Sequence, residues 1–119
     1  MSVLKRNKEI IKAKDAGRTF VDLSKEYGIA PAALSQVYYG FENLINRPYY
    51  DRVAEMDFSA QVGTKLVNAL HKYERLHSID LTLDEIRDME REEFIIMRGV
   101  GVSVARAFDR FREALNDES

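Results

Sequence analysis

Hydrophobic residues recur every three or four positions along most of the chain, which is the period of a helix with one buried face. In the first half this pattern predicts four helices, over residues 3–15, 20–27, 31–39 and 48–56. Gly17, Gly28 and Gly40 are expected to end the first three helices. Thr19 is expected to cap the second, with Asp22 three residues on in the manner of a capping box.

The second half of the chain keeps the same period, and no segment alternates polar and apolar residues as a strand does. Its predicted helices cover residues 60–76, 82–89, 90–97 and 103–115. Ser59 is expected to cap the first of them, and the tail at 116–119 is expected to be frayed. The sequence therefore predicts an all-α protein with two small helical domains, residues 1–57 and 58–119.

Composition narrows the class of protein. With 119 residues, of which 45% are hydrophobic, the chain can bury a core. It has no cysteine, so disulfides and thiolate metal sites are excluded. Charged residues recur too often for a signal peptide or a membrane span. We therefore expect a cytoplasmic protein that contacts no membrane.

The net charge is −2, but the charges are unevenly placed along the chain. Residues 1–18 carry six basic side chains against two acidic ones. Residues 80–93 reverse this, with seven acidic side chains and two arginines. The first segment suits contact with phosphate, whereas the second repels it.

Residues that could carry chemistry are few. His71 and His77 are the two histidines, and with no cysteine or third histidine they predict no zinc site. We interpret them as separate surface residues. The sequence has no phosphate loop, no dinucleotide-binding glycine run and no nucleophile elbow. It therefore predicts a binding protein and not an enzyme, with no cofactor and no metal.

Residues 20–40 pair two short helices across a glycine. Gly28 supplies the left-handed backbone that a tight turn needs, and Leu34 seats the second helix on the first. This spacing resembles the helix-turn-helix of bacterial and phage repressors. It departs from that pattern at Ser24, where alanine is commoner, and at Ala30, where a polar cap is usual.

The resemblance implies that the helix from Pro31 lies in the major groove of DNA. Its outward residues would then be Ala32, Ala33, Ser35, Gln36 and Tyr39. Gln36 would pair with adenine, and Arg18 and Lys25 would contact phosphate. The helix has no Arg or Lys, so a guanine-reading contact is missing. The plain alternative is a helical hairpin in a small bundle.

Residues 94–108 hold a second pair of helices. Gly99 and Gly101 flank one aliphatic residue just before a helix. The backbone N–H groups of this corner can therefore meet an anion beside the helix N-terminus. Val100 is expected to point inward, and Ala105 is small where the helices cross. The pattern resembles the helix-hairpin-helix of DNA-repair and replication proteins.

The wider segment, residues 59–115, resembles the C-terminal domain of the bacterial RNA polymerase α subunit. Lys65, Asn68 and Leu70 fall where that domain has arginine, asparagine and leucine. Lysine lacks the planar fork of arginine, and valine and serine replace the basic pair after the hairpin glycine. The resemblance implies a site for phosphate or a partner formed by Lys65, Asn68, Arg98, Gly99, Val100, Gly101, Val102, Ser103 and Arg106.

Together the two patterns predict a small DNA-binding regulator of transcription, of bacterial or phage type. Its expected partners are double-stranded DNA, RNA polymerase or another transcription protein, and a second copy of the chain in a homodimer. Two alternatives stay open. One is a protein-interaction module that mimics the polymerase domain, favoured by an exposed Val102. The other is an accessory protein that binds DNA without sequence preference.

Overall fold

The computed structural model describes residues 2–118, and these residues form eight α-helices and no strand. The prediction of an all-α protein is therefore confirmed. The helices are α1 Val3–Asp15, α2 Phe20–Tyr27, α3 Pro31–Phe41, α4 Pro48–Glu55, α5 Ala60–His77, α6 Leu83–Asp88, α7 Arg91–Ile95 and α8 Val102–Asp117.

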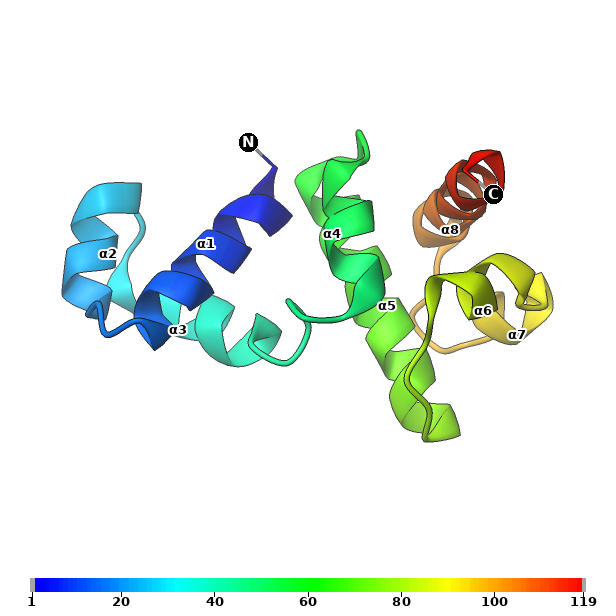
Figure 1. Cartoon of the computed structure of the whole chain (residues 1–119), viewed down its shortest axis with the longest axis horizontal. Coiled ribbons are helices and arrows are strands. Elements are labelled where there is room, and N and C mark those ends of the chain that lie inside the picture. Colours follow the sequence, from blue (N-terminus) through cyan, green and yellow to red (C-terminus); the bar gives the residue numbers. More distant parts are fainter. Residues whose placement is uncertain (1, 119) are drawn as a thin grey trace.

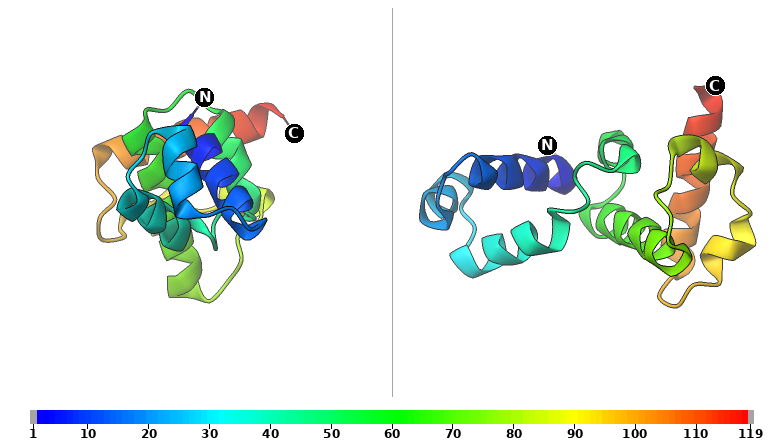
Figure 2. Two further views of the ribbon diagram at one scale, coloured as in Figure 1. Left: turned by 90° about the vertical axis from the view of Figure 1, so that its left-hand side faces the viewer. Right: turned by 60° about the horizontal axis from the view of Figure 1, so that its bottom comes forward.

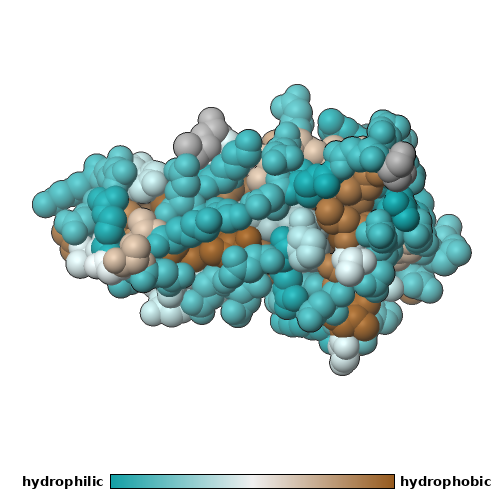
Figure 3. Space-filling model, viewed as in Figure 1, coloured by the Kyte–Doolittle hydropathy of each residue, from teal (hydrophilic) through white to brown (hydrophobic). Residues whose placement is uncertain are grey.

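The helices form an elongated body of 44 × 27 × 24 Å. Helices α1, α2 and α3 make up one end, α4 and α5 lie in the middle, and α6, α7 and α8 make up the other end (Figure 1, Figure 2). The face shown in Figure 3 is mostly hydrophilic, and apolar side chains show between α1 and α3 and beside α5. Within residues 2–118, no helix combines the length and the apolar character that crossing a membrane requires.

Side-chain caps start several of the helices. Thr19, Ser59 and Thr82 each accept a backbone N–H of the first turn on the hydroxyl oxygen. At Thr82 the box is complete, because the Glu85 carboxylate accepts the Thr82 N–H in return. At Thr19 only the bond from the Asp22 N–H forms, so half of the predicted capping box is present.

The end of α3 differs from the prediction. The helix continues through Gly40 to Phe41, and the Glu42 N–H still donates to the Tyr38 carbonyl. A glycine ends a helix where its backbone turns left-handed, as at Gly28 with φ 68°. Gly40 does not take that conformation, so the prediction that it ends the helix is wrong.

The C-terminal tail is also more ordered than predicted. Helix α8 runs to Asp117, and Glu118 forms an ion pair with Arg52 of α4. The prediction of a frayed tail is therefore wrong for residues 116–118, because α8 keeps its backbone hydrogen bonds and its end is held to a neighbouring helix. Residue 119 lies outside the described residues.

Two clusters of buried apolar side chains hold the helices together. The smaller cluster is centred on Ile10, Leu23 and Leu34, which come from α1, α2 and α3 and are fully buried. The larger cluster extends from Leu4 in α1 to Leu115 in α8 and includes buried residues of α4, α5, α6 and α7. Packing thus continues across residues 57 and 58, where the sequence predicts a domain boundary.

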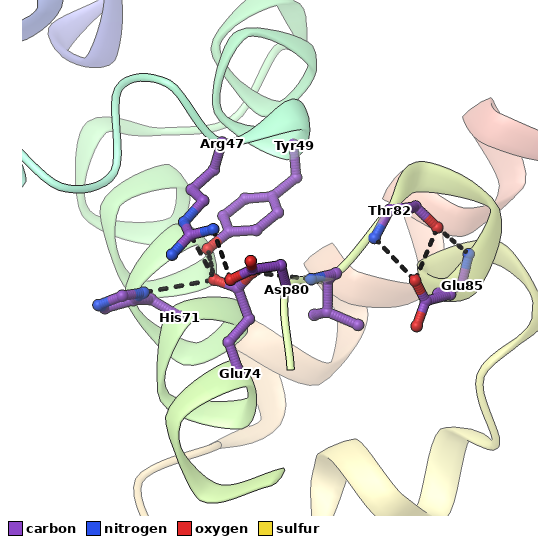
Figure 4. Close-up of polar contacts among 8 residues, drawn as sticks. Arg47, Tyr49, His71, Glu74, Asp80, Thr82 and Glu85 are labelled. Atoms are coloured by element: carbon purple, nitrogen blue, oxygen red, sulfur yellow. Dashed lines mark hydrogen bonds and ion pairs between the residues drawn. The ribbon is translucent and has the colours of Figure 1, made fainter. Parts of the chain in front are cut away.

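A buried carboxylate joins α4, α5 and the chain before α6 (Figure 4). Glu74 is 3% exposed and accepts hydrogen bonds from the Tyr49 hydroxyl at 2.5 Å and the Leu81 N–H at 2.8 Å. Arg47 Nε and His71 Nδ1 lie 3.7 Å and 3.3 Å from its Oε1 atom. Burial, and then the bond to Glu74, raise the pKa of the Tyr49 phenol, which therefore stays a donor.

His71 is half-buried and belongs to this polar cluster. The interpretation of both histidines as separate surface residues is therefore wrong for His71. The reason is its position three residues before Glu74 on α5, which brings the two side chains to one face of the helix.

Candidate nucleic-acid interface

The hairpin between α7 and α8 lies beside α5 (Figure 1, Figure 2), and a groove of about 640 Å³ opens between them. One wall comes from residues 61–75, and the other comes from residues 98–104. The groove gathers most of the site predicted for the second motif: Lys65, Asn68, Arg98, Gly99, Val100, Gly101, Val102 and Ser103. Arg106 is exposed on α8 but does not line the groove.

The two glycines of the hairpin differ in backbone conformation. Gly99 has φ 92°, a left-handed conformation that glycine adopts without strain. Gly101 has an ordinary φ of −88°, and a Cβ added there would meet nothing within 4 Å. The Val100 N–H donates to the Met97 carbonyl while its side chain packs on the larger cluster, as predicted. The space in front of α8 therefore stays open.

Helix α8 presents an uncapped N-terminus to the groove. No side chain caps it, and its first turn holds no acidic residue. The first-turn N–H groups of Val102, Ser103 and Val104 have no acceptor among the described residues. These donors and the positive end of the helix dipole favour an anion at this position.

Four cations line the groove, and among the described residues no carboxylate does. They are Lys65, Lys72 and Arg75 from α5 and Arg98 from the hairpin. Lys72 Nζ donates to the Arg98 carbonyl at 2.6 Å, which links α5 to the hairpin. None of the four forms an ion pair with a described residue, so their charge is available to a bound anion.

Sequence reasoning missed Lys72 and Arg75. Their signal was present, because Lys65, Asn68, Lys72 and Arg75 are separated by three, four and three residues and so share one face of α5. The sequence pattern of α5 alone does not indicate that this face borders the hairpin. Amide, guanidinium, ammonium and hydroxyl donors in one groove suit an anion with many oxygens, such as a sugar–phosphate backbone.

Two apolar side chains border the hairpin. Val102 lines the groove and is 68% exposed, and Ile96, just before the hairpin, is 78% exposed. Exposed apolar side chains beside a binding groove are typical of surfaces that contact other proteins. The prediction that Val102 stands outward is confirmed.

The face of α3 predicted to meet DNA is only partly exposed. Gln36 and Ala32 are exposed, and Tyr39 is exposed to 66%. Ala33 and Ser35 are half-buried, since the helix is seated on the smaller cluster through Leu34 and Val37. The start of α3 has proline at its first position and no side-chain cap.

Charge is scarce around α3. Arg18 forms an ion pair with Glu26, which neutralises it, and Lys25 is exposed without such a pair. The hydrogen bond from Tyr38 to Asp15, 2.6 Å long, raises the pKa of the phenol to about 12 and links α3 to α1. This face therefore offers polar and aromatic contacts to a ligand, but little attraction for phosphate.

Within residues 2–118, no three acidic, histidine or cysteine side chains are placed to hold a metal ion. Comparison with protein families, with curated proteins and with solved structures found no match for this chain. What the groove binds is therefore inferred from its own shape and charge.

Proposed function

We propose that this protein binds double-stranded DNA and holds its sugar–phosphate backbone in the groove between α5 and the α7–α8 hairpin. One observation carries the proposal: an open helix N-terminus and four cations share a lining that holds no carboxylate among the described residues. Each phosphate that a cation neutralises releases condensed counterions, and this release supplies most of the affinity of such sites.

The chemistry of the lining favours a duplex over a single strand. Sites for single-stranded nucleic acid stack bases on aromatic side chains along a basic groove. Among the described residues, no Phe or Tyr lines this groove. Its donors instead suit phosphate oxygens, which a duplex presents on its outside while the bases stay stacked within.

The helix-turn-helix resemblance supports a second contact with DNA, through the exposed residues of α3. Gln36 has the amide that pairs with adenine in the major groove, and Tyr39 stands beside it on the exposed face. Because α3 lacks a cation, the groove provides most of the affinity and α3 adds sequence preference. This division of labour fits a small transcription regulator of bacterial or phage type.

The proposal is tested by titrating a labelled 20-base-pair duplex with the full chain at several salt concentrations and following fluorescence anisotropy. The logarithm of the binding constant should fall linearly with the logarithm of salt, by about 0.9 per phosphate contacted. Arg98→Glu should weaken binding, whereas Lys12→Glu, the same charge change at an exposed position on α1, should not. Binding that ignores salt, or equal weakening by both variants, would overturn the proposal.

The contribution of α3 has a separate test. Gln36→Ala should relax preference at one base pair by about 1–3 kcal/mol, because the bidentate contact with adenine is lost. Selecting bound duplexes from a random pool with the parent chain and with the variant measures this change. Identical selected sequences would remove α3 from base reading and leave the groove as a binder without sequence preference.

A second candidate function is docking of a transcription protein, favoured by the exposure of Ile96 and Val102 beside the hairpin. Purified bacterial RNA polymerase is the probe for this function. If it is correct, Ile96→Ser should abolish capture of the polymerase and leave the affinity for duplex DNA unchanged, since Ile96 does not line the groove and serine adds no charge beside it.

A further inference from the structure

The cations of α5 form a row along the groove. Lys65, Asn68, Lys72 and Arg75 share one face of this 18-residue helix, and all of them line the groove. From Lys65 to Arg75 the helix rises about 15 Å, at 1.5 Å per residue. A phosphate held only by the hairpin and the start of α8 would leave the far part of this row unused.

We propose that α5 follows the DNA backbone, so that Lys72 and Arg75 bind phosphates beyond the one held at the hairpin. The ligand is thus a run of phosphodiesters on one strand of a duplex, lying along α5. Phosphates of one strand rise about 3.4 Å along the duplex axis per nucleotide and also turn about it, so their spacing along the strand is longer, and a row of about 15 Å meets at most about four of them. This inference rests on the proposed function of the groove.

Lys72 connects the hairpin with the rest of the row. Its ammonium group donates to the Arg98 carbonyl at 2.6 Å, which fixes the side chain between the two walls of the groove. An ammonium group has three N–H donors, so two stay free for phosphate oxygens. A half-buried lysine held in this way loses little further conformational freedom when it binds.

Arg75 ends the row. Its guanidinium is exposed, forms no ion pair with a described residue, and can contact two oxygens of a phosphate at once. Arg75 also borders the hollow that contains Glu74 and Asp80. Both carboxylates are engaged by Arg47, so they leave Arg75 free to meet DNA.

The test compares salt dependence in paired variants of the full chain, using the same labelled duplex. The double variant Lys72→Gln with Arg75→Gln should lower the slope by about 1.8, which is about 0.9 for each cation. Between 50 and 200 mM salt, the parent chain should therefore lose about tenfold more affinity than this variant. The control is Lys5→Gln with Lys12→Gln, which removes the same charge from exposed positions on α1 and should keep the parent slope.

Two outcomes separate the row along α5 from the proposed function of the groove. If the double variant keeps the parent slope while Arg98→Glu weakens binding, the row along α5 is wrong and the hairpin site stands. If neither change affects binding, the proposed function itself fails. Circular dichroism checks that the variants fold. Arg75→Gln alone, which breaks no hydrogen bond or ion pair with a described residue, should still lower the slope by about 0.9.

Discussion

The α2–α3 pair and the α7–α8 pair have the same kind of turn but differ in their surroundings. Both join two helices near a left-handed glycine, Gly28 with φ 68° and Gly99 with φ 92°. The exposed face of α3 has no cation, and Glu26 neutralises the nearby Arg18. The α7–α8 hairpin instead faces the basic side of α5. A turn pattern thus fixes the local backbone, while a third helix decides whether the corner attracts an anion.

The two pairs also differ in how they are buried. The α2–α3 pair is packed around three fully buried side chains, whereas the α7–α8 pair belongs to the larger cluster. In that cluster Phe94 and Phe108 stack with ring centroids 3.9 Å apart. We therefore expect the free energy of local opening to be lower for α2–α3 than for the helices around the groove.

The largest effect is expected from Phe108→Ala. This change removes a fully buried ring from the larger cluster and should lower the free energy of unfolding by about 3–5 kcal/mol. Urea denaturation followed by circular dichroism measures it. Leu76→Ala is the control, because Leu76 is 62% exposed and should change stability by less than about 0.5 kcal/mol. Similar losses in both variants would mean that the ring pair is not central to the core.

Leu23→Ala should destabilise the other end of the molecule. Loss of a fully buried leucine from the smaller cluster costs about 2–5 kcal/mol. Because α2 and α3 depend on this cluster, amide hydrogen exchange should quicken in residues 20–41 and stay slow in residues 60–115. Equal loss of protection along the whole chain would contradict a difference in stability between the two ends.

Changing the helix caps of α3 and α6 should shift the free energy of unfolding in opposite directions. Ala30→Ser supplies the hydroxyl that the start of α3 lacks, and it should raise the free energy of unfolding by about 1 kcal/mol. Thr82→Ala removes the capping box of α6 and should lower it by a similar amount. Thermal denaturation reports both. A lower melting temperature for Ala30→Ser would show that the turn before α3 does not tolerate a hydroxyl cap.

The smallest expected change is a gain in DNA binding. Ala32→Lys adds to the exposed face of α3 the cation that it lacks and keeps Gln36 in place. It should steepen the salt slope by about 0.9, so that binding weakens about threefold more than in the parent chain between 50 and 200 mM salt. Glu113→Gln changes the net charge by the same amount at an exposed position on α8. An equal gain in both variants would mean that overall charge, and not its place on α3, governs binding.

Much of the fold could be predicted because caps and glycines act locally. Thr82 and Gly28 mark helix boundaries through bonds and dihedral angles within a few residues, and the sequence displays both. Gly40 misled the prediction, since glycine permits a left-handed end without requiring one. The end of α8 was missed because Glu118 is held by Arg52, which is distant in sequence.

The residues of the candidate site could likewise be predicted only where their signal is local in the sequence. Gly99, Gly101 and Ser103 could be predicted because a short hairpin motif contains them. Lys72 and Arg75 join them only where α5 packs beside the hairpin, and that contact links residues 26 apart, as between Lys72 and Arg98. The ion pair between Arg18 and Glu26 was also missed, because the turn from α1 into α2 brings these two exposed side chains together.

The larger cluster has a consequence for any attempt to take the protein apart. Leu4 and Ile11 of α1 are buried with Leu66 and Phe108, so the first helix helps to complete the core that α5 and α8 share. A fragment beginning at residue 58 would expose to water the apolar surface that α1 and α4 now cover. The two ends of the molecule therefore cannot be exchanged as independent domains, and a chimaera that keeps the groove must also contain α1.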